Sequence, residues 1–280
     1  MRVVDDEAIQ QHGAVRFRSD YHYAVFEYWR SAKLLGYLER AGIRRFLRVL
    51  DDGCGGGGMC VSFAEEAPFV VGIDLTDRFR DAGSRLAAEK RVRHARFARA
   101  DGTALPFRDG AFDLVLSHAV IEHVKDPGAY LREARRVLQT GGLLFLQTAP
   151  YLSPSGAHLP RLKVPVPLHL IVGHRAAFAA SRWLAKRAPQ WLDVASEGSS
   201  FVTLARRGEE KIDDLLYRVT VWNLRRHILD AGFRLVREDL YVSRLATRLL
   251  SSRLSALVTR VPLFRDILVT NMEYILAPAS

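Results

Sequence analysis

Largely apolar runs of strand length alternate with longer mixed segments along the first half of the chain. Residues 47–52, 68–74 and 112–117 are such runs, and turn residues follow them. The segments between them, such as 78–91, have the length of a helix. Alternating strands and helices predict an α/β fold, in which a mostly parallel sheet carries helices on both faces.

The first of these runs ends in two acids and a burst of glycine. Leu47–Asp52 predicts a buried parallel strand, and residues 53–58, Gly-Cys-Gly-Gly-Gly-Gly, predict a tight turn into a helix that begins near Met59. Glycine has no Cβ, so the backbone of such a turn can approach a ligand closely. A nucleotide-binding turn is therefore expected, the alternative being a glycine-rich surface turn without a ligand.

Two nucleotide templates fit this turn, and no Gly-Lys-Ser/Thr follows it, which excludes a P-loop. The dinucleotide pattern G-x-G-x-x-G is matched by Gly53, Gly55 and Gly58, and an acidic-x-G-x-G-x-G pattern is matched by Asp51, Gly53, Gly55 and Gly57. Carboxylates at Asp51 and Asp52 would repel a diphosphate and attract an ammonium or sulfonium group. The acids therefore favour a cationic nucleotide ligand.

A further acid, Asp74, ends the run 68–74. It lies 21 residues beyond Gly53, where a carboxylate can accept hydrogen bonds from both ribose hydroxyls. Both templates predict this acid, so it indicates a ribose without distinguishing them. The alternative role for Asp74 is to cap a helix that begins near Arg78.

An ordered set of motifs follows the turn at fitting spacing. The set comprises Ala100–Phe107, Phe112–Ser117, Val120–Val124 and Gly141–Leu146. Together with the acidic glycine turn, it resembles the small-molecule branch, of ubiquinone and lipid type, of the class I S-adenosylmethionine-dependent methyltransferases. The resemblance covers about residues 46–150. It implies a Rossmann-like sheet of seven strands, mostly parallel with an antiparallel last strand, and S-adenosylmethionine as the cofactor.

The resemblance also implies a cofactor-binding set. It places the methionine end of the donor at the acidic glycine turn, the ribose at Asp74 and the adenine at Asp101 with Gly102. The whole set is Asp51, Gly53, Cys54, Gly55, Gly57, Asp74, Leu75, Asp101, Gly102, Thr103 and Ser117. Asp52 departs from the family, which more often has an apolar residue there; it either adjusts the ammonium pocket or points to solvent.

Methyl transfer from a sulfonium requires alignment of nucleophile, methyl group and sulfur, and it requires a base only when the acceptor must lose a proton. Three histidines are candidates for that base: His118, His123 and His158. Ser117 and His118 end the run 112–117 and are expected to face the ligand cleft. No set of metal ligands is expected.

Four segments are expected along the chain. Residues 1–46 form an N-terminal helical cap, whose aromatic spacing predicts a helix over 24–41, and residues 47–150 form the cofactor-binding core. Residues 151–222 form a substrate lid that contains Trp183 and Trp191. Residues 223–280 complete the sheet and embed a basic helix near 245–258, which either lies on lipid or, as we favour, packs on the body.

Composition restricts the partners. The chain has 280 residues and a net charge of +10, with 19 Lys/Arg against 11 Asp/Glu from residue 151 onward. That surplus suits an anionic partner, such as nucleic acid, an acidic lipid headgroup or a phosphorylated substrate, or it is only a solvated surface. No signal peptide or membrane span is expected. The expected location is the cytoplasm, with peripheral membrane contact through the basic C-terminal region left open, and Cys54 and Cys60 are expected to be packing thiols.

The favoured function is O-methylation of a small lipophilic or lipid- or glycan-linked acceptor. A nicotinamide-dependent oxidoreductase or epimerase is disfavoured because no Tyr-x-x-x-Lys pair is present and the turn is acidic. A nucleic-acid methyltransferase would be expected to carry Asp/Asn-Pro-Pro-Tyr after residues 112–116, where this chain has Ser117, His118, Ala119 and Val120. Nucleic acid is therefore an unlikely partner.

Overall fold

A seven-stranded sheet forms the centre of the computed structural model, which describes residues 4–16, 18–153, 168–188, 191, 217–242 and 261–279. The strand order is β3-β2-β1-β4-β5-β7-β6. The strands are β1 (Arg48–Asp52), β2 (Phe69–Asp74), β3 (Ala95–Arg99), β4 (Phe112–His118), β5 (Leu138–Thr148), β6 (Phe233–Val242) and β7 (Val269–Pro278). Strands β1 to β5 pair in parallel, and β7 is antiparallel to both β5 and β6. The predicted Rossmann-like sheet with an antiparallel last strand is confirmed.

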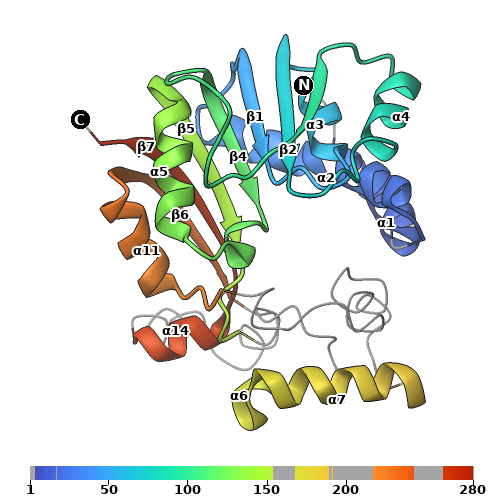
Figure 1. Cartoon of the computed structure of the whole chain (residues 1–280), viewed down its shortest axis with the longest axis vertical. Helices are drawn as coiled ribbons and strands as arrows, with labels where there is room; N and C mark the ends of the chain where they lie inside the picture. The colour runs from blue at the N-terminus through green and yellow to red at the C-terminus, as the bar shows by residue number, and fades with distance from the viewer. Residues whose placement is uncertain are drawn as a thin grey trace.

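Helices cover both faces of this sheet (Figure 1). On one face, α2 (Asp20–Arg40), α3 (Gly58–Phe63) and α4 (Ala82–Glu89) share a buried apolar cluster with β1 and β2. On the other face, α5 (Pro127–Val137) and α11 (Val221–Asp230) share a second cluster with β4, β5 and β7. Because β1 has β2 on one side and β4 on the other, the strand order reverses beside it. In parallel sheets, ligands bind at the carboxyl ends of the strands at such a point.

Side chains of β1 alternate between these two faces. Val49 belongs to the cluster under α2, and Leu50 to the cluster under α5. Since the alternation has a period of two, Asp51 shares the α2 face with Val49, and Asp52 shares the α5 face with Leu50. The two consecutive acids are thereby directed to different neighbours.

The N-terminal segment holds two helices, one more than the spacing predicts. Helix α1 (Asp6–Val15) begins after Asp5, whose carboxylate accepts from the N–H of Ala8, and it packs on α2. Helix α2 begins earlier than the predicted residue 24, because the side chain of Ser19 accepts from the N–H of His22 and caps it. Its length brings charged residues over the glycine turn.

Two predicted helices are shorter in the structure. The helix after the glycine turn, expected to reach Ala67, ends as α3 at Phe63, and the helix expected over 78–91 is reduced to α4. Residues 77–80 form a turn instead, closed by the N–H of Arg80 donating to the carbonyl of Asp77 at 2.8 Å.

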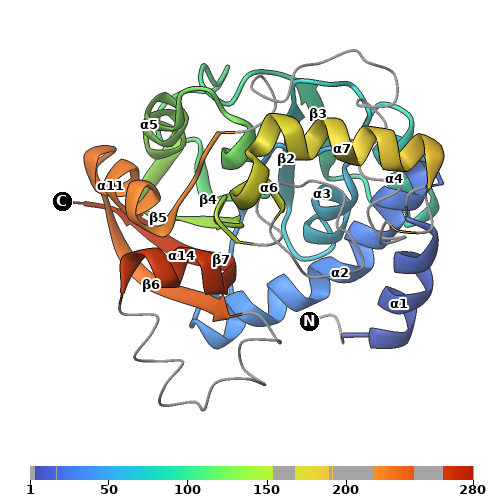
Figure 2. The ribbon, with the colours of Figure 1, turned by 90° about the horizontal axis from the view of Figure 1, so that it is seen from below.

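Beyond residue 150 the structure describes two helices before α11. These are α6 (Leu168–Val172) and α7 (His174–Arg187), which lie across from the strand ends (Figure 2). A ring nitrogen of His169 hydrogen bonds the carbonyl of Tyr151 at 2.8 Å and ties α6 to the chain just after β5. Helix α14 (Pro262–Leu268) precedes β7. The predicted basic helix near 245–258 lies outside the described residues. Within the described ranges, no helix has the length and apolarity to cross a bilayer.

Candidate functional site

The tip of β1 carries two buried acids. Asp51 and Asp52 are each 2% exposed, and one carboxylate oxygen of each, Oδ2, has no hydrogen-bond partner among the residues described. Burial, reinforced by the charges of nearby acids, raises the pKa of Asp51 well above its usual range and that of Asp52 to about 7. Leaving a buried acceptor unsatisfied costs about 1–3 kcal/mol. Such atoms indicate that a polar ligand belongs here, and Asp52 does not point to solvent.

The glycine turn follows directly. Gly53, Gly55 and Gly57 have φ angles of 91°, 53° and 83°, in the left-handed region that favours glycine. A Cβ at position 53 would lie 2.3 Å from a methyl group of Val120, whereas a Cβ at position 55 would meet no atom within 4 Å. The turn is therefore packed against the protein at Gly53 and open at Gly55, as a backbone cradle for a ligand requires.

Asp74 connects the end of β2 to this turn. Its Oδ2 accepts from the N–H of Gly55 at 2.9 Å, and its Oδ1 accepts from the N–H and hydroxyl of Thr76 at 2.8 and 2.7 Å. A carboxylate has about four acceptor sites, so Asp74 keeps capacity for ribose hydroxyls. Asp74 therefore lies beside the turn, as the predicted pairing requires.

Asp101 follows β3 at the neighbouring strand end. Its Oδ1 accepts from the N–H and hydroxyl of Thr103 at 2.8 and 2.7 Å. A Cβ at Gly102 would lie 2.7 Å from the Oδ1 of Asp52, which brings this loop next to the β1 tip. The guanidinium of Arg136 donates to the carbonyls of Leu105 and Phe107 and holds the rest of the loop. The structure thus brings Asp51, Asp52, Asp74 and Asp101 to one edge of the sheet.

Comparisons with known proteins agree with this geometry. A family model described as a methyltransferase domain matches residues 50–146. An uncharacterized methyltransferase of Mycolicibacterium gilvum is 40% identical over 136 residues, which are 48% of this chain and 49% of that protein. One of Schizosaccharomyces pombe is 30% identical over 142 residues, 48% of this chain and 51% of that protein. Residues 50–146 of the chain are therefore similar to a methyltransferase domain.

Solved structures of other proteins show the same fold. An S-adenosylmethionine-dependent methyltransferase from Mesorhizobium loti has a TM-score of 0.53 and 18% identity, over 89% of this chain and 97% of that one. Magnesium protoporphyrin IX methyltransferase from Synechocystis, solved with S-adenosylhomocysteine, has a TM-score of 0.51 and 16% identity, over 93% and 86%. The chain spans about half the length of the curated relatives it matches. The similarity to a methyltransferase domain therefore rests on residues 50–146.

The three candidate histidines differ in their positions. His118 ends β4, where burial, reinforced by the charge of Arg30, lowers its pKa to about 3. Ala119, the next residue, has a φ of 57°, a strained value of the kind found at functional sites. His123 ends the single 3-10 turn η1 (Ile121–His123). His158 lies outside the described residues, so the structure brings only His118 and His123 near the strand ends.

Three predicted positions contribute differently from their expected roles. Ser117 does not face the same side as His118, because neighbouring residues of a strand point to opposite faces; its hydroxyl is buried and accepts from the hydroxyl of Tyr130 at 2.8 Å. The thiol of Cys54 packs against Gly72, so its backbone is the part available to a ligand. Leu75 is 63% exposed beyond Asp74.

Sequence reasoning missed three side chains that surround the site. Glu27 and Arg30 lie on α2, and their charges shift the pKa of Asp51 and His118 respectively. Tyr130 on α5 lies beside Gly102 and Ser117. The signal that points to the α2 pair is a Glu and an Arg three residues apart within an aromatic, apolar segment, where solvated charges are not expected.

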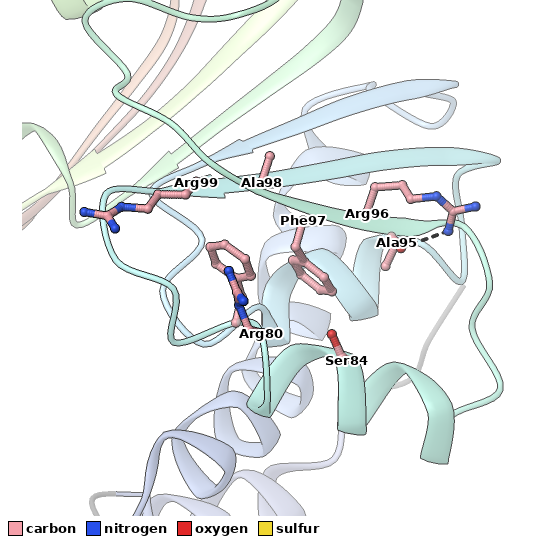
Figure 3. A pocket seen from close by; sticks show the side chains of 8 residues that line it. Arg80, Ser84, Ala95, Arg96, Phe97, Ala98 and Arg99 are labelled. Carbon is pink, nitrogen blue, oxygen red and sulfur yellow. Dashed lines mark hydrogen bonds between the residues drawn. The ribbon is translucent and has the colours of Figure 1, made fainter.

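A separate groove follows β3 at the outer edge of the sheet (Figure 3). Phe79 and Phe97 stack in it with ring centroids 5.6 Å apart, and Arg80, Arg96 and Arg99 line it. Arg96 and Arg99 donate to main-chain carbonyls nearby. None of the predicted cofactor-binding residues lines this groove, and charged side chains on an edge strand also discourage pairing with other chains.

Proposed function

We propose that the protein transfers a methyl group from S-adenosylmethionine to a hydroxyl oxygen of a small lipophilic or lipid-linked acceptor. The observation that supports the donor is the pair of buried carboxylate oxygens at the tip of β1. They have no hydrogen-bond partner in the part of the chain that the structure describes, and they lie beside a glycine turn with an open position. A ligand with an ammonium group satisfies such oxygens, whereas a diphosphate would be repelled.

Each strand end has a part of the donor to hold. Asp51 and the backbone of the glycine turn bind the methionine end, Asp74 accepts from the ribose hydroxyls, and Asp101 with Gly102 faces the adenine. When bound, the donor supplies a methyl group that its sulfonium already activates. The protein's task is to orient the acceptor and to exclude water, and positioning of this kind can contribute about 7–11 kcal/mol.

His118 is the histidine best suited to orient an acceptor. It lies at the end of β4 within range of the charge of Arg30, and its pKa of about 3 keeps the imidazole neutral near pH 7. A neutral imidazole nitrogen accepts a hydrogen bond from a hydroxyl. The depressed pKa makes His118 a weak base, so we assign it the positioning of the acceptor rather than the removal of its proton. His123 and His158 remain candidates for proton transfer.

The acceptor class is inferred from the apolar surface of the segment after β5. Ile171 and Val172 of α6 are 67% and 48% exposed, and Trp183 of α7 is 59% exposed. A hydrogen bond between His169 and the carbonyl of Tyr151 holds this segment next to the end of β5, at the edge of the sheet where the parallel strands end. Exposed apolar side chains accompanied by arginines suit an amphiphilic acceptor or a membrane surface that presents one.

Calorimetric titration tests the donor assignment. The protein is titrated with S-adenosylhomocysteine and, separately, with NAD. We expect one S-adenosylhomocysteine to bind per chain and NAD to give no heat of binding. Binding of NAD alone would overturn the proposal.

A methylation assay with labelled donor tests the acceptor class. The panel contains hydroxylated amphiphiles, polar metabolites of matched hydroxyl type and transfer RNA. We expect label in the amphiphiles. Label in RNA or in polar metabolites only would remove the lipophilic acceptor while leaving the donor assignment intact.

A further inference from the structure

Unpartnered buried polar atoms gather at helix α2 and at the tip of β1. Among the described residues, six buried side-chain nitrogen and oxygen atoms lack a hydrogen-bond partner. Four of them belong to Glu27, Arg30, Asp51 and Asp52. Since nearly all buried polar groups in folded proteins are hydrogen-bonded, four exceptions around one turn point to a ligand of matching charge.

Helix α2 is in direct contact with the glycine turn. A Cβ at Gly58 would lie 2.0 Å from the carbonyl oxygen of Ala24, and one at Gly56 would lie 3.2 Å from that of Asp20. The side chain of Asp20 also accepts from the guanidinium of Arg78 at 2.7 Å, which fixes the start of the helix over the residues that follow β2. Glu27 therefore projects from the helical turn next to the contact, and Arg30 from the turn after it.

The charges on this side form a mixed set. Glu27 interacts with Asp51 and Asp74, and burial raises its pKa to about 7 although Arg30 and Arg78 oppose the shift. The guanidinium Nη2 of Arg30 lies 3.5 Å from a carboxylate oxygen of Glu27, yet it makes no hydrogen bond within the described structure. Glu27 thus lies within range of the charges of both Asp51 and Arg30, and each of these three side chains has an atom without a hydrogen-bond partner among the described residues.

We propose that α2 completes the donor site, with Arg30 binding the carboxylate of the amino-acid end and Glu27, together with Asp51, binding its ammonium. An amino acid carries both charges within a few bonds, which matches an arginine beside two acids. This inference rests on the proposed function, because the ligand is the amino-acid end of the same donor. It adds to the donor site two residues of α2, which precedes β1 in the chain and lies outside the glycine turn.

The test compares ligands that differ only in the amino-acid end. S-Adenosylhomocysteine carries ammonium and carboxylate, its decarboxylated analogue lacks the carboxylate, and 5′-methylthioadenosine lacks both. With Arg30→Gln, we expect the affinity for S-adenosylhomocysteine to fall about 10- to 100-fold, the loss of one charge-assisted hydrogen-bonded pair. The affinities for the decarboxylated analogue and for 5′-methylthioadenosine should stay at their wild-type values.

Glu27→Gln gives the complementary result. It should lower the affinities for S-adenosylhomocysteine and the decarboxylated analogue by the same factor, since both carry the ammonium. The affinity for 5′-methylthioadenosine should not change. Lys33→Gln is the matched control: Lys33 lies one turn beyond Arg30 on the same helix, and its ammonium pairs with Asp6 at 2.7 Å on the exposed side. That variant should bind all three ligands as the wild type does.

The wild-type protein provides one comparison of affinities that needs no variant. It should bind the decarboxylated analogue more weakly than S-adenosylhomocysteine by the factor that Arg30→Gln costs. Equal wild-type affinities for these two ligands would overturn the inference. So would an unchanged affinity of Arg30→Gln for S-adenosylhomocysteine combined with lost methyl transfer, which would assign Arg30 to the acceptor. Failure of the wild type to bind S-adenosylhomocysteine at all would instead overturn the proposed function itself.

Discussion

The two faces of the sheet differ sharply at the tip of β1. On the α2 face, Asp51 has charged neighbours with unused hydrogen-bonding capacity, Glu27 and Arg30. On the α5 face, Asp52 lies beside Gly102 and Tyr130, whose hydroxyl donates to Ser117. One peptide bond separates the two acids, and strand alternation alone divides them. The difference teaches that the charged and neutral parts of a ligand can be received on opposite faces of one strand.

The largest effect is expected on the α2 face. Asp51→Asn keeps the side chain's size and removes the charge that attracts an ammonium. We expect the affinity for S-adenosylhomocysteine to fall about 100-fold, equivalent to roughly 3 kcal/mol, and that for 5′-methylthioadenosine to fall much less. Titration calorimetry measures both. Equal losses for the two ligands would show that Asp51 is no specific partner of the amino-acid end and would erase the contrast between the faces.

Asp74, at the end of β2, should affect both kinds of ligand. Its carboxylate holds the N–H of Gly55 and is proposed to hold the ribose, which all three ligands carry. Asp74→Ala should lower the affinities for S-adenosylhomocysteine and 5′-methylthioadenosine by the same factor, about 30-fold, which corresponds to about 2 kcal/mol of binding free energy.

Asp77→Ala is the control for this substitution, since Asp77 is exposed and its ion pair with Arg80 is long at 3.9 Å. It should bind both ligands normally. If Asp74→Ala spared 5′-methylthioadenosine, the assignment of Asp74 to the ribose would be wrong.

A smaller, pH-dependent effect is expected from the carboxyl groups whose pKa is raised. The pKa of Glu27 and of Asp52 is about 7 in the folded protein, so each goes from about one-tenth to about nine-tenths ionised between pH 6 and 8. The ammonium requires ionised partners, and Glu27 is the one of these two groups that is proposed to bind it. The affinity for S-adenosylhomocysteine should therefore rise about tenfold over this interval. Glu27→Gln should flatten the rise, and an affinity independent of pH in the wild type would contradict it.

The same groups predict the opposite trend for the protein without ligand. A carboxyl whose pKa is higher in the folded than in the unfolded state favours folding at low pH, and this contribution is lost as the pH rises through the folded value. The unfolding temperature should therefore fall from pH 5 to pH 8 more steeply in the wild type than in Asp52→Asn. Parallel curves for the two proteins in differential scanning calorimetry would show that Asp52 is not desolvated in solution.

The parts of the site that the sequence predicts are those carried by strand ends. Asp51, Asp74 and Asp101 each follow an apolar run, and parallel strands bring their carboxyl ends to one edge whatever the details of packing. The glycine turn is equally local, because positive φ at Gly53, Gly55 and Gly57 is a property of the residue type. The sheet order follows from the resemblance to the methyltransferase family.

The parts that escaped prediction depend on packing between distant segments. Glu27 and Arg30 lie more than 20 residues before the glycine turn, and only the seating of α2 on Gly58 brings them to it. Helix 78–91 was predicted too long because the turn at residues 77–80 has no strong breaker in the sequence. Ser117 and His118 are expected together at the cleft, but the period-two alternation of a strand places their side chains on opposite faces of the sheet.

The smallest effect is expected on the α5 face. Tyr130→Phe removes the hydroxyl that donates to Ser117, so the buried hydroxyl of Ser117 loses this hydrogen bond. We expect the free energy of unfolding to fall by about 1 kcal/mol, which corresponds to roughly 2–4 °C in Tm for a chain of this size. Affinity for 5′-methylthioadenosine should fall about threefold or less, because the tyrosine only supports Asp52 and Gly102 and is not itself proposed to bind the ligand. Tyr28→Phe is the matched comparison: it removes a hydrogen bond to Glu65, 2.6 Å long, from the opposite face. A similar change in Tm with no change in affinity is expected there, and a larger affinity loss in Tyr28→Phe than in Tyr130→Phe would reverse the roles assigned to the two tyrosines.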